Sequence, residues 1–279
     1  MSFIKTEIIG FLQYISNIKN YSQKTVLTYQ ISLDKIFEIS EVFEENDIWI
    51  LDINKFRLAS AKNLKTKTIS KDLSALKSFA KYLRETKKLK IKVIGANNPR
   101  TPKTLPKPIN FESISDVLCV CNEEQKMIIE LIYALGLRVS EIAKMRLEDI
   151  SNGWVNIFGK GSKQRQIPLL PNIEEKLKQY IKIRNPKIYI FEKNGEPFSV
   201  SQFQYRVKKS FAQLGIDASP HKLRHSFATH LLNEGARIND VSELLGHSNI
   251  GTTNIYTKLS STKKYNDYFK AHPLNRQNG

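Results

Sequence analysis

Cysteine is scarce in this chain of 279 residues, with only Cys119 and Cys121, two positions apart. That spacing suits neither a zinc site nor a disulfide, so we expect two small buried side chains in a reducing compartment. No segment approaches the ~20 consecutive apolar residues of a membrane span. The first residues also lack the basic region and apolar run of a secretory signal. The sequence therefore predicts a cytoplasmic protein without membrane contact.

Motifs for nucleotide or metal chemistry are missing as well. The run Gly159-Lys160-Gly161-Ser162 contains the residue types of a phosphate-binding loop, but not the Gly-x4-Gly-Lys-[Ser/Thr] spacing. His221 and His225 are four positions apart, yet the residues between them are Lys-Leu-Arg and would repel a dication. We expect no cofactor and no metal, and structural roles for His225 and His230.

Acidic residues are outnumbered, at 27 Asp and Glu against 44 Lys and Arg, for a net charge of +17. This excess favours a polyanionic partner, either nucleic acid or an acidic membrane surface. The alternative is a lysine-rich composition inherited from an AT-rich genome. Between residues 53 and 92 there are thirteen Lys or Arg and only two acidic residues. A helix face of one sign repels itself unless an anion is present, which favours a DNA-facing helix over a merely solvated one.

The length allows two domains. Apolar residues recur at helical spacing throughout residues 3–92, and Ser22 can cap the second helix. We predict a helical, DNA-binding domain over residues 1–94, a proline-rich linker over 95–108 and a catalytic domain over 109–279. In the last of these, residues 111–149 and 173 onward are mainly helical. Short strands at 154–158 and 166–169 flank a glycine-rich turn. The predicted fold is mainly α with a small antiparallel β element.

Several basic residues occupy recognisable local positions. Gly136 can end a helix, which places Arg138 at a helix junction, although a salt bridge to Glu141 is the simpler interpretation. Lys160 lies at the tip of the predicted hairpin; such a lysine is usually solvent-exposed without a specific role, but it can also enter a minor groove or protonate a leaving oxygen. Pro220 starts a helix that carries His221 and Arg224 near its N-terminus, where backbone amides favour an anion.

Two further residues follow in the chain. His247 comes directly after Gly246, which ends another helix. Tyr256, judged alone, would be a core residue between Ile255 and Thr257. The ordered series of basic groups before Tyr256, with no metal or nucleotide motif, is what suggests covalent chemistry on a phosphodiester.

Together these segments resemble the tyrosine recombinase family, and within it the Xer-type and related phage-integrase-like enzymes. The resemblance spans the whole chain and rests on the following residues: Ser22 to Thr25 and Tyr29, Asn98-Pro99 through Lys107, Gly136-Leu137-Arg138 with Ser140-Glu141, Gly159-Lys160-Gly161, His221-x-x-Arg224 through Thr229, Leu245-Gly246-His247, and Tyr256. It implies a SAM-like core-binding domain followed by a tyrosine-recombinase catalytic domain.

The resemblance implies that Tyr256 is the nucleophile, leaving a 3′-phosphotyrosine and a free 5′-hydroxyl. Arg138 and Arg224 would hold the non-bridging oxygens of the scissile phosphate. A covalent phosphotyrosine conserves the energy of the cleaved bond, so rejoining would need neither ATP nor a metal.

By the same resemblance, Lys160 would protonate the leaving oxygen, His221 would assist proton transfer from the nucleophile, and His247 would hydrogen-bond the phosphate. The family acts as a homo- or hetero-tetramer on two DNA duplexes, through a Holliday junction. The implied partners are double-stranded DNA, neighbouring protomers docked through a C-terminal helix, and a DNA translocase of the FtsK type. Leu259, Tyr265, Tyr268 and Phe269 would belong to that docking segment.

Three alternatives stay open. A type IB topoisomerase shares the tyrosine chemistry, and a DNA-binding protein with an inactive site would share the charge. Within the family, a resolvase of chromosome dimers competes with the integrase or resolvase of a mobile element. The compact length, without an additional arm-binding domain, favours chromosome dimer resolution.

Overall fold

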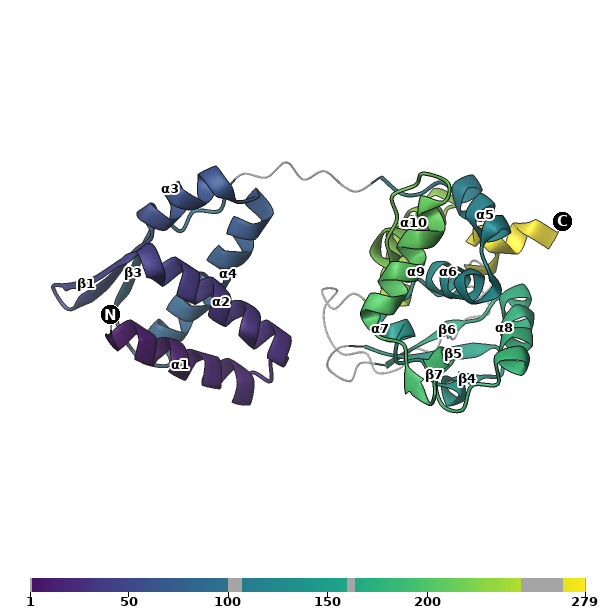
Figure 1. Cartoon of the computed structure of the whole chain (residues 1–279), viewed down its shortest axis with the longest axis horizontal. Helices are drawn as coiled ribbons and strands as arrows, with labels where there is room; N and C mark the ends of the chain where they lie inside the picture. The colour runs from purple at the N-terminus through teal and green to yellow at the C-terminus, as the bar shows by residue number, and fades with distance from the viewer. Residues whose placement is uncertain (1, 100–106, 160–163, 247–267, 279) are drawn as a thin grey trace. The chain divides into compact units, whose positions relative to one another are not determined.

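The computed structural model describes residues 2–99, 107–159, 164–246 and 268–278 (Figure 1). The chain forms two compact units, Met1–Thr104 and Leu105–Gly279, and the boundary falls inside the proline-rich segment. In these ranges no helix combines the length and the apolar character required to cross a membrane.

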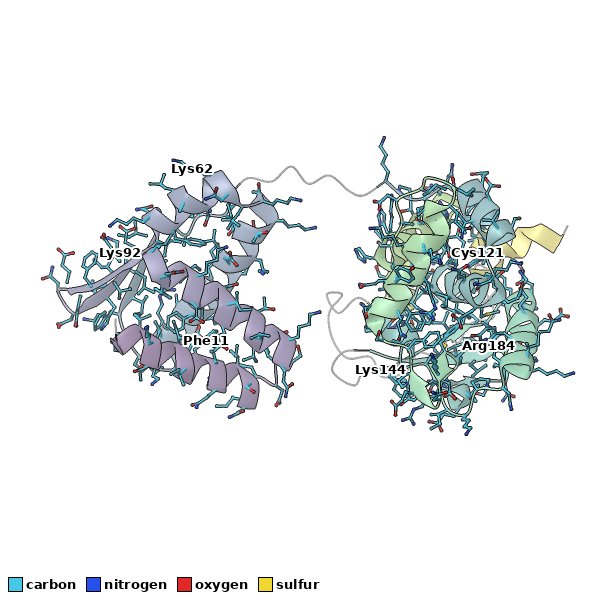
Figure 2. All side chains as sticks on the ribbon, in the orientation of Figure 1. Phe11, Lys62, Lys92, Cys121, Lys144 and Arg184 are labelled. Atoms are coloured by element: carbon cyan, nitrogen blue, oxygen red, sulfur yellow. The ribbon has the colours of Figure 1, made fainter. Side chains whose placement is uncertain are left out.

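Four helices dominate the first unit: α1 (Ser2–Asn17), α2 (Gln23–Ile39), α3 (Asn54–Asn63) and α4 (Thr66–Glu85). The predicted cap is confirmed, because the Ser22 hydroxyl accepts a hydrogen bond from the Thr25 amide at 3.3 Å. The apolar stripe of α4 is buried, and Phe11 of α1 lies inside the unit with it (Figure 2). This unit therefore has a core of its own.

The prediction of helix throughout residues 3–92 is wrong for three segments. These form a sheet in the order β1 (Glu41–Glu45), β2 (Ile48–Asp52) and β3 (Ile91–Ile94). Asn46 and Asp47 both adopt positive φ, at 49° and 57°, which is the requirement of a tight two-residue hairpin turn between β1 and β2. The β2 segment is Ile-Trp-Ile-Leu-Asp, whose first four residues are of types that favour strands, and it pairs in parallel with β3.

The second unit is larger. Its elements in chain order are α5 (Phe111–Val120), α6 (Glu123–Leu135), α7 (Val139–Ile142), η1 (Leu147–Asp149), β4 (Ile150–Ser151), β5 (Trp154–Phe158), β6 (Gln164–Pro168), α8 (Pro171–Arg184), β7 (Glu192–Lys193), β8 (Glu196–Pro197), α9 (Val200–Ala212), α10 (Pro220–Asn233), α11 (Ile238–Leu245) and η2 (Pro273–Asn278). Figure 1 shows α6 in the middle, with α10 on one side and α8 on the other. Every residue of α6 from Met127 to Leu135 is buried, so this helix is the centre of the core.

The predicted hairpin is confirmed, since β5 and β6 pair antiparallel with Phe158 opposite Gln164. The prediction that both cysteines are buried is wrong for Cys119, which is exposed, whereas Cys121 is buried. The buried residues of this segment are Ile114, Val117 and Cys121, at helical spacing. Cys119 lies two positions after Val117, and this places it on the opposite, solvent-facing side.

The described C-terminal residues pack against the rest of the second unit. The Tyr268 hydroxyl donates to the Ala134 carbonyl at 2.9 Å, and His272 Nε2 lies 3.1 Å from the same oxygen. His272 has no solvent exposure. Leu259 and Tyr265, the earlier part of the expected docking segment, lie outside the described residues.

Candidate active site

Three arginines from different elements converge on one buried carboxylate. Glu141 accepts hydrogen bonds from Arg138 Nη1 at 2.8 Å and from Arg165 Nη1 and Nη2 at 2.9 Å each. Arg224 Nη1 lies 3.7 Å from the same carboxylate. Three positive charges around one negative charge leave a net charge of +2, which suits an anion whose charge is spread over several oxygens.

Arg224 is held by the C-terminal ends of two helices. Its Nη1 donates to the Gly136 carbonyl and its Nη2 to the Leu245 carbonyl, both at 2.6 Å. Pro220 occupies the first turn of α10, as predicted, and Ser219 caps it, so Arg224 lies one turn into the helix. Burial, and then the charge of Arg138, lowers the pKa of Arg224 to about 10, which keeps it protonated at neutral pH.

Arg138 is the most accessible of the three arginines. Gly136 ends α6 in the left-handed conformation, as predicted, and α7 begins directly after Arg138. The Arg138 amide donates to the Glu141 carboxylate at 2.7 Å, and its Nη2 donates to the Gly246 carbonyl at 3.2 Å. Its side chain is 40% exposed, compared with 13% for Arg165. Arg138 can therefore contact a ligand while it keeps its ion pair.

Glu141 is ionised within this cluster. Burial alone would raise the pKa of its carboxyl, but hydrogen bonds and charge from Arg165, followed by hydrogen bonds from Arg138, outweigh burial and lower it. The salt bridge that was the simpler interpretation of Arg138 thus exists. It forms part of the site and does not exclude a role in binding an anion.

The structure describes three of the six predicted site residues. It brings Arg138 and Arg224 together, and it places His221 on the exposed first turn of the same helix as Arg224. Lys160, His247 and Tyr256 lie outside the described residues.

Arg165 was missed by the sequence analysis, although a signal for it exists. The side chains of β6 alternate, and Arg165 lies on the same side of the strand as Ile167, which is fully buried. An arginine on the apolar side of a strand requires a buried carboxylate or carbonyl partner. That reasoning would have predicted an ion pair, though not that Glu141 would supply it.

The side chain of His230 has a structural contact, in agreement with expectation. Its Nδ1 lies 2.7 Å from the Tyr133 hydroxyl, and burial lowers its pKa. The His225 carbonyl accepts a hydrogen bond from the Thr229 hydroxyl one turn later. Within the described parts of the chain, no three His, Cys, Asp or Glu side chains form a group that could hold a metal ion.

Two protein-family models match this chain. The model described as "Phage integrase family" matches residues 108–263, more than half of the chain. A second, "Phage integrase, N-terminal SAM-like domain", matches residues 8–87. The chain belongs to the phage integrase family, whose members are tyrosine recombinases.

Curated relatives are similar in sequence to this chain over nearly its whole length. A protein of Bacillus licheniformis named tyrosine recombinase XerC is 33% identical over 300 residues, covering 98% of both chains. One of the same name from Rickettsia canadensis is 34% identical over 293 residues, covering 95% of both. The phage-integrase-family chain described here is thus an enzyme of site-specific recombination.

Solved structures of integrases and recombinases have the same fold. Lambda integrase bound to DNA has a TM-score of 0.66 at 16% identity, covering 91% of this chain and 95% of its own. XerH recombinase bound to a palindromic difH substrate also has a TM-score of 0.66, at 22% identity, covering 92% and 79%. The predicted fold class, mainly helical with an N-terminal SAM-like domain and a catalytic domain, is confirmed.

Proposed function

We propose that the chain cuts and rejoins DNA through a 3′-phosphotyrosyl intermediate on Tyr256, and that it acts in Xer-type resolution of chromosome dimers. The observation that carries the chemistry is the convergence of Arg138 and Arg224 in a cluster of net charge +2. Two arginines that share a carboxylate leave N–H donors for the non-bridging oxygens of a phosphate. Charge that builds on those oxygens in the transition state is stabilised by donors already in place.

The proposed cleavage is a transesterification. The Tyr256 oxygen forms a bond to phosphorus, and the bond from phosphorus to the 5′-oxygen breaks. Lys160 supplies the proton for the leaving oxygen. His221 assists removal of the proton from Tyr256, because a phenol with a pKa near ~10 is largely protonated at neutral pH. His247 donates to the phosphate. Rejoining reverses these steps with the 5′-hydroxyl of another strand.

We further propose double-stranded DNA as the partner, held by the first unit as well as the second. Helix α4 supports this, because its apolar stripe is buried while Lys67, Lys71 and Lys81 stay on the surface. Solved structures of the same fold include lambda integrase bound to DNA and a lambda integrase tetramer bound to a Holliday junction. We infer that this chain also acts as a tetramer on two duplexes.

The Xer assignment has separate support. The two relatives described above, and others from Bacillus subtilis and Escherichia coli, carry the name XerC and cover nearly their full lengths. An integrase or resolvase of a mobile element is the alternative. Sequencing of the genomic fragments bound by the protein separates the two: a single palindromic site near the replication terminus indicates a resolvase, whereas a site at the end of an inserted element indicates an integrase.

Covalent capture tests the chemistry. Sheared genomic DNA of the source organism is incubated with the full chain, denatured in SDS, and the protein-linked fragments are sequenced. Wild type should yield adducts at one site, and a nicked duplex of that site should trap the adduct quantitatively. Tyr256→Phe should yield none, while Tyr205→Phe, which alters a 63% exposed tyrosine on α9, should match wild type. Adducts formed equally well by Tyr256→Phe would refute the assignment of the nucleophile.

A further inference from the structure

Arg165 is the most heavily bonded member of the arginine cluster. Its two terminal nitrogens form a paired, fork-like contact with both oxygens of Glu141, at 2.9 Å each. Its Nε donates to the Leu244 carbonyl at 2.7 Å. Only an arginine can make all three bonds from one rigid plane.

The position of Arg165 makes it a poor ligand for DNA. Three of its five side-chain N–H groups already point at protein oxygens, whereas Arg138 and Arg224 each use two. The guanidinium also packs closely under the end of α11. A Cβ added at Gly246 would lie 3.2 Å from Arg165 Nη1 and 3.3 Å from its Cδ. Arg165 therefore acts on other protein groups.

Arg165 connects three segments that are separate in the sequence: its own strand β6, the start of α7 and the end of α11. Arg165 itself extends from β6, which pairs with β5. Through Glu141 it reaches the start of α7, because the same carboxylate holds both the amide and the guanidinium of Arg138. Through Leu244 it holds the end of α11, whose next carbonyl, that of Leu245, binds Arg224.

We propose that Arg165 is a positioning residue for DNA cleavage, which orients Arg138 and Arg224 by holding Glu141 and the C-terminal end of α11. This inference rests on the proposed cleavage chemistry. Without the fork, Glu141 keeps only one hydrogen-bonded arginine, Arg138, and can turn with it. The end of α11 also loses the donor to its Leu244 carbonyl. A misplacement of about 1 Å at a catalytic group can reduce a rate by about 10²-fold.

Two substitutions at Arg165 and a matched control test the proposal. Arg165→Lys keeps the charge but cannot donate to both Glu141 oxygens and to Leu244, and Arg165→Met removes the charge. Arg206→Met is the control, since Arg206 also forms a partly buried ion pair, with Glu124 at 2.7 Å, within the same unit. The probe is the nicked duplex of the site recovered by covalent capture, at saturating and at limiting concentrations.

The single-turnover cleavage rate at saturating DNA should fall by roughly 10-fold in Arg165→Lys and 10²-fold in Arg165→Met. The dissociation constant for DNA should change by less than about 3-fold, because Arg165 does not touch the duplex. Arg206→Met should match wild type in both. If Arg165→Met fails to fold, Arg165→Lys decides the question, and cleavage by Arg165→Lys at the wild-type rate overturns the proposal.

Hydrogen exchange provides a readout that needs no DNA. Peptides covering residues 136–142 and 238–246 should exchange faster in Arg165→Lys, and peptides from the centre of α6 should not. Unchanged exchange in both peptides overturns the positioning role. If wild type forms no adduct on any DNA, the proposed function fails, and the exchange result alone then decides whether Arg165 holds these segments.

Discussion

The C-terminal segment should be less stably docked in mild acid, because His272 is buried as a neutral ring. Its Nε2 donates to the Ala134 carbonyl, and its Nδ1 accepts from the Leu274 amide at 3.2 Å. Protonation of Nδ1 would place its new N–H against the Leu274 N–H, so that two hydrogen-bond donors would face each other and the hydrogen bond would be lost. Burial lowers the pKa of His272 to about 3; the hydrogen bond to Ala134 opposes this shift and the charge of His230 adds to it.

The direction and the size of the pH effect on stability follow from proton linkage. The folded-state pKa lies below the unfolded value of ~6.5, so below that pH the unfolded chain binds a proton that the folded chain does not. The contribution of His272 to the free energy of unfolding of the second unit is therefore fully present above pH ~6.5, and it is lost as the pH falls from there toward 3. Between pH 7.5 and pH 5 the loss from this one residue is about 2 kcal/mol, from ~1.4 kcal/mol for each pH unit below 6.5.

Urea unfolding of the second unit measures this loss. The chain has two tryptophans, Trp49 in the first unit and Trp154 in the second. In a Trp49→Phe background the fluorescence of Trp154 therefore reports the second unit alone. His272→Gln keeps an amide that can donate and accept but does not titrate. His221→Gln, at an exposed position, is the control.

At pH 7.5, His272→Gln should be less stable than the background by about 1 kcal/mol, from weakened buried hydrogen bonds. At pH 5 it should match or exceed the background, because the background has lost about 2 kcal/mol and the variant has not. His221→Gln should follow the background at both pH values. A stability difference for His272→Gln that is the same at pH 7.5 and pH 5 would refute the neutral, buried assignment.

Two further predictions concern packing. Asp72→Ala removes a buried carboxylate of α4 that accepts hydrogen bonds from two side chains of α2. In a Trp154→Phe background, urea unfolding followed by Trp49 fluorescence should show a loss of about 2 kcal/mol for the first unit. Asp34→Ala, on the exposed face of α2, should cost less than about 0.5 kcal/mol. Gly136→Ala places a Cβ 2.5 Å from the Phe227 ring at a residue with a φ of +57°, and should lower the free energy of unfolding by more than about 2 kcal/mol. Gly215→Ala is the control: its φ is +69° but the space around it is open, so the loss should be only about 1 kcal/mol. Equal losses at the two glycines would show that the ring moves away freely.

Local signals predicted the helix boundaries that hold the site. Gly136 and Gly246 end their helices in the left-handed conformation, and Pro220 begins α10, all as expected from the residue types. The missed sheet of the first unit had a different origin. The β2–β3 pairing is distant, since Trp49 pairs with Ile91, and periodicity within a short window does not register a partner that far along the chain. The β1–β2 hairpin is local, and its signals, the turn at Asn46 and Asp47 and the strand-favouring residues of β2, were not used in the prediction.

The candidate site was predicted as a set of residues but not as an arrangement. The resemblance named Arg138 and Arg224, because each lies in its own motif. Arg165 belongs to no such motif, and its importance comes from a carboxylate 24 residues earlier and a carbonyl 79 residues later. Interactions of this kind depend on how the hairpin packs against α7 and α11, which no local pattern specifies.

The arginine cluster is assembled largely by helix ends. The last carbonyls of a helix lack partners within it and carry the negative end of the helix dipole. Gly136 ends α6 and Gly246 ends α11, and the carbonyls at these ends accept hydrogen bonds from Arg224, Arg165 and Arg138. Two helix termini and one carboxylate thus hold three like charges close together. Because these partners are mostly backbone atoms, substitutions that shift either helix end should disturb the arginines as strongly as substitutions of Glu141 itself.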